Sequence, residues 1–415
     1  MNRYTHRQRL GREICNFLII PQGYAKMKQY GFYVRITDKN RSEGALYMYT
    51  EKDLVRIAKR ENNKKRNYLV VNPLQGKHIP VSPRKALEVF SKLAELLEVY
   101  KGERILVIGF AETATAIGAQ IAIDIGADYI QTTREEIPHA EYLFFSEEHS
   151  HATEQKLVKN DLDKVIDRID RIIFAEDEVT TGKTIWNLIT VLERQYGRKI
   201  KFAVASLLNG MQEEAVKSFE ERGIGLHYLV KIRHDTYPET ADRAVDDGRY
   251  YQEDISAAKY TACLDVDGWM DTRRLTDTVK YENACMKRSE EITKRLSLEN
   301  YKSILVLGTE EFMFPGLYLG RYLEEREYSV KFHATTRSPI TVRGNEEYPL
   351  QERYALQSMY DDERKIFLYN IGRYDAVIVV TDAQENAPKG RRGELSLLNA
   401  VRKKNEVVYF VRFSH

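Results

Sequence analysis

Short apolar runs alternate with amphipathic stretches along most of this 415-residue chain, and this alternation constrains the fold more than any other feature. The runs have the length of buried strands, and the stretches between them carry apolar residues at the spacings of three and four that are typical of helices. Strands that alternate with helices form a parallel sheet covered on both faces. The pattern predicts an α/β fold, with strands over 104–109, 172–175 and 201–208 and helices over 82–100, 115–125, 185–196 and 212–222.

A polar, turn-rich segment interrupts the alternation between His234 and Arg274 and predicts a domain boundary there. We expect a first domain over residues 1–235 and a second over 236–415. In the second domain the alternation resumes, with strands expected over 303–308, 329–334, 376–380 and 406–412 and a helix over 316–325.

The second half resembles a degenerate copy of the first. In each half a strand ends in Gly-x-x-Glu, at Glu112 and at Glu311, and is followed by a helix and then by Thr-Thr-Arg. From Thr133 to Asp177 is 44 residues, and from Thr336 to Asp382 is 46. Matched order and near-equal spacing favour duplication of one fold, and convergent α/β patterning is the alternative.

The most specific motif is the run 172–184, where an apolar strand leads into Glu176 and Asp177 and then into Thr-Thr-Gly-Lys-Thr. Carboxylates at a strand end accept hydrogen bonds from vicinal sugar hydroxyls, and small turn residues let backbone amides and the next helix close around a phosphate. This order of residue types suits a ribose 5-phosphate. The alternative is an ordinary acidic turn after a buried strand.

A Walker A loop is excluded, although Gly182-Lys183-Thr184 resembles the end of one. That loop requires a glycine five residues before Gly182. Asp177 stands there instead, and its charge would repel the phosphates of a nucleotide.

The run 172–184 resembles the 13-residue signature of type I phosphoribosyltransferases, which use phosphoribosyl diphosphate (PRPP). The resemblance implies transfer of ribose 5-phosphate to an unidentified base-like or small-molecule acceptor, with release of diphosphate. Glu176 and Asp177 would hold the ribose, and Mg²⁺ is expected because diphosphate needs a hard cation; it would be held mainly by PRPP. The residues implied in PRPP binding are Val179, Thr180, Thr181, Gly182, Lys183 and Thr184.

The same resemblance implies a diphosphate loop and a mobile basic segment. The loop consists of Ala111, Glu112, Thr113 and Ala114, although the Glu112 carboxylate would repel diphosphate unless a cation or hydroxyl intervenes. Alternatively, Glu112 stabilises the N-terminus of the following helix. In the segment that begins with Thr132-Thr133-Arg134, we expect Arg134 to act at the diphosphate, and His149 or His151 to contact phosphate or transfer a proton. A solvated loop is the alternative for both histidines.

Residues before the first core strand form a hood over the acceptor in this family, here about 10–80. Lys77 and His78 lie in a turn-rich stretch and are the candidates for acceptor or diphosphate contacts. Ser82 and Pro83 just after them suit the start of a helix.

The whole chain resembles a bacterial two-part family in which a phosphoribosyltransferase precedes a TRSP domain, often encoded near tellurium-resistance and ATP-grasp genes. The segments that carry the resemblance are 76–83, 176–184 and 335–339, and the last contains Thr-Arg-Ser-Pro. The resemblance implies synthesis of a nucleotide-like metabolite. In the second half the loop 381–390 keeps one carboxylate and lacks Thr-Thr-Gly, so it should not bind PRPP in the same way. It would bind another anion, complete the first site or mediate assembly; its candidate residues are Glu311, Arg337, Ser338 and Asp382.

Net charge and the lengths of the apolar stretches limit the kinds of partner that the chain is expected to have. A net charge of +2 argues against a nucleic-acid-binding surface, and no apolar stretch is long enough to span a bilayer. The N-terminus lacks the apolar core of a signal peptide, so a cytoplasmic location is expected. Type I relatives commonly pair, which makes a homodimer an expectation. Two other functions remain open: a PRPP-binding regulator without transferase activity, and an interaction scaffold.

Overall fold

The computed structural model describes residues 49–61, 63, 65–145, 155–197, 200–384 and 390–414, together with the backbone of five short strands between Arg9 and Arg35. The chain divides into two compact units, 1–47 and 48–415. In the first unit an antiparallel pair and a three-stranded antiparallel sheet are formed by β1 (Arg9–Leu10), β2 (Glu13–Ile14), β3 (Phe17–Ile20), β4 (Tyr24–Met27) and β5 (Tyr33–Arg35). Both α/β halves lie in the second unit.

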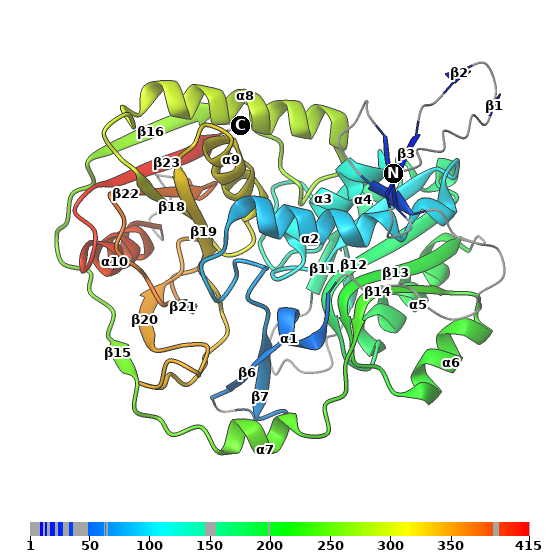
Figure 1. Ribbon diagram of the computed structural model, residues 1–415, viewed down its shortest axis with the longest axis horizontal. Helices are drawn as coiled ribbons and strands as arrows, with labels where there is room; N and C mark the ends of the chain where they lie inside the picture. Colours follow the sequence, from blue (N-terminus) through cyan, green and yellow to red (C-terminus); the bar gives the residue numbers. More distant parts are fainter. Residues whose placement is uncertain are drawn as a thin grey trace. The chain divides into compact units, whose positions relative to one another are not determined.

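The first half of the second unit is built on a six-stranded sheet with the order β14-β13-β12-β8-β9-β17 (Figure 1). Its five parallel strands are β8 (Ile105–Gly109), β9 (Asp128–Gln131), β12 (Arg171–Val179), β13 (Lys201–Asn209) and β14 (Gly225–Lys231). Its helices are α2 (Pro83–Glu95), α3 (Thr115–Ile125), α5 (Lys183–Tyr196) and α6 (Glu213–Glu221). The strand and helix positions predicted for this half are confirmed to within a few residues.

The second half carries a five-stranded, wholly parallel sheet with the order β16-β23-β22-β18-β19. Its strands are β16 (Ala262–Asp267), β18 (Ser303–Gly308), β19 (Ser329–Ala334), β22 (Ala376–Thr381) and β23 (Val408–Ser414), and its helices are α8 (Thr278–Arg295), α9 (Phe314–Glu324) and α10 (Gly390–Arg402). A smaller sheet beside it contains β15 (Arg249–Tyr251), β20 (Glu352–Gln357) and β21 (Lys365–Tyr369). The predicted α/β class is confirmed.

Shorter elements surround the first sheet. Within the expected hood, about 10–80, the second unit contains α1 (Glu51–Leu54) and the antiparallel hairpin of β6 (Arg56–Lys59) and β7 (Tyr68–Val71). A second antiparallel hairpin and two short helices are formed by β10 (Tyr142–Phe145), β11 (Gln155–Val158), α4 (Lys159–Leu162) and α7 (Tyr237–Asp242). Ala58 and Val71 of the hood share a buried cluster with Ile340, Val342 and Tyr369, so the second half supports the hood.

The two halves exchange short segments at the edges of their sheets. Thr276, in β17 (Thr276–Asp277) just before α8, pairs antiparallel with Tyr129 of the first sheet. In the matching position, Val81 just before α2 pairs antiparallel with Phe332 of the second sheet, with N–H to O distances of 2.9 and 2.7 Å. In each half, a residue two positions before a helix thus pairs with the edge strand of the other half's sheet. This reciprocity supports the predicted duplication.

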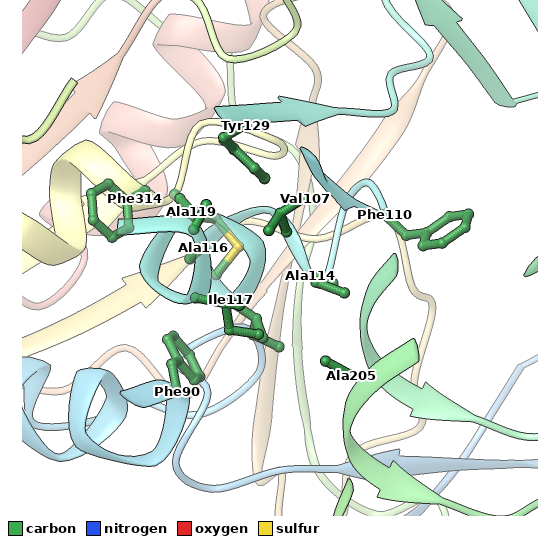
Figure 2. Close-up of a cluster of buried hydrophobic side chains, with 14 of the residues drawn as sticks. Phe90, Val107, Phe110, Ala114, Ala116, Ile117, Ala119, Tyr129, Ala205 and Phe314 are labelled. Atoms are coloured by element: carbon green, nitrogen blue, oxygen red, sulfur yellow. The ribbon is translucent and has the colours of Figure 1, made fainter. Parts of the chain in front are cut away.

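Helix α3 lies at the centre of the first half and carries the loop 111–114 at its N-terminus. Figure 2 shows Ala116 and Ala119 of this helix near Phe314 of α9, and Ile117 near Phe90 of α2. A Cβ on Gly118 would lie 2.9 Å from the Cα of Gly109, so α3 and β8 are in direct backbone contact. Close packing therefore fixes the distance between the loop and the sheet.

Helix α2 begins as the sequence predicts. The Ser82 hydroxyl accepts a hydrogen bond from the Lys85 amide at 3.4 Å, and Pro83 occupies the first helical position. Glu324 of α9 adds to this cap by accepting hydrogen bonds from Ser82 Oγ and the Arg84 amide, both at 2.7 Å. None of the helices in the described part of the chain has the length and hydrophobicity that a bilayer crossing requires.

Candidate functional site

The acidic pair lies on the last third of β12, which extends four residues beyond its expected end at Ala175. Pairing of β12 with β8 stops at Ala175, whereas pairing with β13 continues to Val179. One edge of the strand is therefore open at Glu176 and Asp177. Ligands in parallel sheets bind at such carboxyl ends of strands.

The chain then turns through 180–182 and enters α5 at Lys183, two residues earlier than expected. Gly182 is the N-cap residue and has a φ of +75°, which favours glycine strongly over residues with a Cβ. A Cβ there would also lie 2.8 Å from the ring of Phe219. The Lys183 amide in the first turn of α5 donates to Thr181 Oγ1 at 3.3 Å, and the helix N-terminus at this turn carries the partial positive charge that suits an anion.

A small cavity of about 50 Å³ occupies this turn. All six residues expected to bind PRPP line it, together with Glu176, Glu178 and Ile185. A larger cavity of about 210 Å³ adjoins it through shared lining residues. It is lined by Arg66, Leu69, Val70, His78, Phe110, Ala111, Thr113, Gln155, Glu176, Asp177, Glu178, Thr180, Thr184 and Ser338. The structure therefore brings together the acidic pair, the threonine turn, part of the loop 111–114 and the hood.

Neutral donors hold Asp177 in this cavity. Thr113 Oγ1 donates to it at 3.0 Å and Gln75 Nε2 at 3.3 Å, and Gln75 Nε2 also donates to the Thr113 carbonyl at 2.8 Å. Beside it, Arg66 Nη2 binds both oxygens of Glu178 at 2.7 and 2.8 Å. Thus Asp177 joins the hood and the loop to the strand, and the hydrogen bonds that its carboxylate receives from the described residues come from neutral groups.

The loop 111–114 is fixed from below by side chains that the sequence analysis did not identify. Gln155 Nε2 donates to the Ala111 carbonyl at 2.8 Å, and the Ala111 amide donates to Thr132 Oγ1 at 2.9 Å. All three residues are buried. The side chains of Gln155 and Thr132 therefore hold the backbone of the loop at Ala111.

Glu112 points out of the cavity toward the second half. Its carboxylate accepts hydrogen bonds from Thr336 Oγ1 at 2.9 Å and from the Arg337 amide at 3.0 Å. The Arg337 guanidinium and the Lys77 ammonium each lie 3.5 Å away. Burial alone would raise the pKa of Glu112, but Lys77, Arg337 and these hydrogen bonds outweigh burial and lower it to about 2. Glu112 is thus ionised, and the nearby Lys77 and Arg337 offset its negative charge.

The matching glutamate of the second half, Glu311, is bound by residues of the first half. Glu311 accepts hydrogen bonds from Thr133 Oγ1 at 2.7 Å and from the Arg134 amide at 3.0 Å, and Arg273 Nε lies 3.1 Å from it. Arg134 is not among the described residues that line the 50 Å³ or the 210 Å³ cavity. Glu112 and Glu311, matched in the sequence, therefore exchange partners across the two halves.

The side chains of Lys77 and His78 have different surroundings. Lys77 is buried, and its ammonium donates to the Glu310 carbonyl at 2.8 Å instead of lining the cavity. His78 lines the cavity and is 2% exposed, and neither ring nitrogen has a hydrogen-bond partner in the described part of the chain. Burial, reinforced by Lys77, lowers the pKa of His78 to about 3, so the ring is neutral. His149 and His151 lie outside the described residues.

The corresponding position in the second half is closed. Asp177 stands two residues after Ala175, which pairs with Gly109. In the second half, Asp382 stands two residues after Val380, which pairs with Gly308. Its carboxylate is bound by Arg273 Nη1 and by the Tyr360 hydroxyl, each at 2.5 Å. Ser338, in contrast, reaches the cavity of the first half. The second half therefore binds the carboxylate of Asp382 with its own side chains and contributes Ser338 to the cavity of the first half.

Two family matches cover most of the second unit. Residues 54–234 match a family described as "Phosphoribosyl transferase", and residues 271–398 match one described as "TRSP domain C terminus to PRTase_2". No curated protein matches the chain.

Similar solved structures include adenine phosphoribosyltransferase from Rhodothermus marinus, with 16% identity over 44% of this chain and 96% of that chain and a TM-score of 0.33. The enzyme of the same name from Thermoanaerobacter pseudethanolicus has 16% identity over 44% of this chain and 97% of that chain, with a TM-score of 0.32. The APRTase from Giardia lamblia complexed with 9-deazaadenine has 14% identity over 44% and 95%, with a TM-score of 0.30.

Proposed function

We propose that this chain, an enzyme with a phosphoribosyltransferase domain followed by a TRSP domain, transfers ribose 5-phosphate from PRPP to a base-like or small-molecule acceptor and releases diphosphate. The observation that carries the proposal is the cavity that unites the acidic pair, the threonine turn and the loop 111–114. In the reaction the bond between the anomeric carbon and diphosphate breaks, a bond to the acceptor forms, and positive charge develops on the sugar ring.

Each part of the cavity suits one portion of PRPP. The turn 180–184 and the N-terminus of α5 would hold the 5-phosphate, because small residues and first-turn amides line that end. Glu176 and Asp177 would hold the ribose hydroxyls, and their negative charge stabilises the cationic transition state. The backbone of Ala111 and Thr113 would face the diphosphate, since both residues line the cavity while Glu112 is turned away.

The residues present fit a magnesium ion that arrives with the substrate. Among the described residues no group of three or more His, Cys, Asp or Glu is placed to hold a metal by itself. Mg²⁺ would take most of its oxygen ligands from diphosphate, with Glu176 or Asp177 as the protein's contribution, and it would supply charge neutralisation to the leaving group.

The acceptor would enter on the side lined by the hood. Leu69 and Val70 provide apolar surface there, and His78 provides a neutral ring with one donor and one acceptor. These groups suit a planar, base-like acceptor, and transfer of ribose 5-phosphate to it would yield a nucleotide-like metabolite. The tellurium-resistance association remains an expectation from resemblance.

Calorimetry with PRPP and Mg²⁺ tests the binding half of the proposal. One PRPP per chain is expected, because the second acidic position is occupied by Arg273 and Tyr360. Diphosphate release on addition of a metabolite extract tests the transfer half. Binding without release would favour a PRPP-binding regulator, and the absence of binding would reject both functions.

A further inference from the structure

The diphosphate loop of the first half is held from outside by the second half. Glu112 receives two hydrogen bonds from Thr336 and Arg337, at 2.9 and 3.0 Å, and no other element of the first half apart from Lys77 pairs with its carboxylate in the described part of the chain. The flanking residues Ala111 and Thr113 line the cavity. The orientation of the loop therefore depends on the Thr-Arg-Ser-Pro segment.

The reverse contact is chemically the same. Thr133 Oγ1 and the Arg134 amide hold Glu311 at 2.7 and 3.0 Å. In both halves the same threonine hydroxyl also accepts a hydrogen bond from the amide two residues later, that of Glu135 at 2.9 Å and that of Ser338 at 3.3 Å. Thr133 and Thr336 are both fully buried, with 0% exposure. They form a matched pair of the same geometry.

The consequences of the two contacts differ, because only one of the two acidic positions is open. On the first side, Ser338 follows Arg337 directly and lines the 210 Å³ cavity that contains Asp177. On the second side, Asp382 is already bound by Arg273 and Tyr360. Loss of the Thr336 contact would release a loop beside an open cavity, and loss of the Thr133 contact would release a loop beside a filled one.

Charge makes this positioning important. A Glu112 side chain that rotated into the cavity would place a carboxylate against diphosphate, at a cost that grows in a partly buried site. Arg337 is well placed to prevent this, because it also binds Glu135 at 2.9 Å and Glu310 at 3.1 Å and is thereby fixed itself. Its side chain is 13% exposed.

We propose that Thr336 and Arg337 are positioning residues for the diphosphate loop, so that the C-terminal half acts as a built-in partner that completes the first site. This inference rests on the proposed function, since it assigns the loop 111–114 to the diphosphate of PRPP. It gives the second half a purpose that requires no ligand of its own.

The test compares Thr336→Val with the matched control Thr133→Val, each of which removes one buried hydroxyl and keeps the side-chain shape. Calorimetry with three ligands, PRPP, inorganic diphosphate and ribose 5-phosphate, separates the two ends of the site. For Thr336→Val we expect Kd for PRPP and for diphosphate to rise about five- to tenfold, the effect of one buried hydrogen bond, and Kd for ribose 5-phosphate to change less than twofold. Thr133→Val should leave all three within twofold.

Two further variants guard against misfolding. Thr336→Ser keeps the hydroxyl and should restore diphosphate affinity, and Glu112→Gln should weaken diphosphate and PRPP selectively if Thr336→Val does not fold. Equal effects of Thr336→Val and Thr133→Val, or a parallel loss of all three ligands, would overturn the inference while wild-type PRPP binding leaves the proposed function intact. A wild-type protein that binds none of the three ligands would overturn the proposed function as well.

Discussion

Asp177 and Asp382 occupy the same position after matching parallel strands, yet a cation binds only the second of these carboxylates among the described residues. Asp382 is bound by the Arg273 guanidinium and the Tyr360 hydroxyl, both at 2.5 Å. Asp177 receives hydrogen bonds from the neutral groups of Thr113 and Gln75, at 3.0 and 3.3 Å. Arg273 supplies a positive charge to the second carboxylate, whereas the side chains that donate to the first, among the described residues, are neutral. One fold has thus produced one open position and one closed position.

This asymmetry predicts that Asp177→Asn abolishes measurable PRPP binding. The substitution removes the negative charge that would hold the ribose while keeping the size of the side chain. The matched control is Asp382→Asn, which should lower the melting temperature because it disturbs a buried ion pair but should leave PRPP affinity unchanged. Calorimetry with Mg²⁺ present measures both, and unchanged affinity in Asp177→Asn would reject the assignment of the acidic pair.

The turn before α5 predicts a coupled loss of stability and binding in Gly182→Ala. A φ of +75° strains alanine, and its Cβ would lie 2.8 Å from the Phe219 ring. We expect the free energy of unfolding to fall by about 1–3 kcal/mol and PRPP affinity to fall with it. Gly197→Ala, at the other end of the same helix, is the control: its φ is +58° and nothing lies within 4 Å of the added Cβ. It should cost stability without affecting affinity.

Two buried histidines predict that the protein loses stability on mild acidification. Burial lowers the pKa of His78 to about 3 and that of His333 to about 4, below the ordinary value of 6.5. Between those values the unfolded chain binds more protons than the folded one, so stability is complete above pH 6.5 and is lost as the pH falls toward 4. Each group contributes a slope of about 1.4 kcal/mol per pH unit in that range.

Urea unfolding at pH 7, 6 and 5 measures this slope. The free energy of unfolding should be about 2–4 kcal/mol lower at pH 5 than at pH 7, and His333→Asn should flatten the dependence. A wild-type stability that is constant over this range would show that the two rings are not buried and neutral.

The ion network around Glu311 predicts a large stability effect at Arg273. Arg273 pairs with both Glu311 and Asp382, and its side chain is 5% exposed. Arg273→Met removes the cation bound to the buried Asp382 and one of the two cations near Glu311, which keeps Arg337 at 3.4 Å, and should cost about 3–5 kcal/mol. Arg321→Met breaks only the partly exposed pair with Glu325 and should cost less than about 1 kcal/mol. Equal costs in chemical denaturation would contradict this reading of the network.

Local patterns predicted much of the fold. The strands 303–308 and 329–334 and the helix 115–125 were expected at their observed boundaries, because apolar runs and helical spacing are local signals. The hairpin β10–β11 was not anticipated, since its strands are short and flank a polar segment. Helix α10 was also missed, because Gly390 and Gly393 lower the helix propensity of its first turn.

The site was predictable where its residues follow one another in the chain. The acidic pair and the turn after it form one continuous run, and the structure gathers them around two adjoining cavities. Gln75, Gln155 and Arg66 were missed, because their partners are 38 to 112 residues away and no spacing rule connects them. The contact of Glu112 with Thr336 and Arg337 was also not predicted, although the match of Glu112 with Glu311 indicated a feature common to both halves.

The most direct measurement of the central claim is mass spectrometry of a metabolite extract incubated with the protein, PRPP and Mg²⁺. The account predicts a new species that carries a ribose 5-phosphate, diphosphate released in equal amount, and neither product with Asp177→Asn. Intact PRPP and no adduct with the wild-type protein would contradict it.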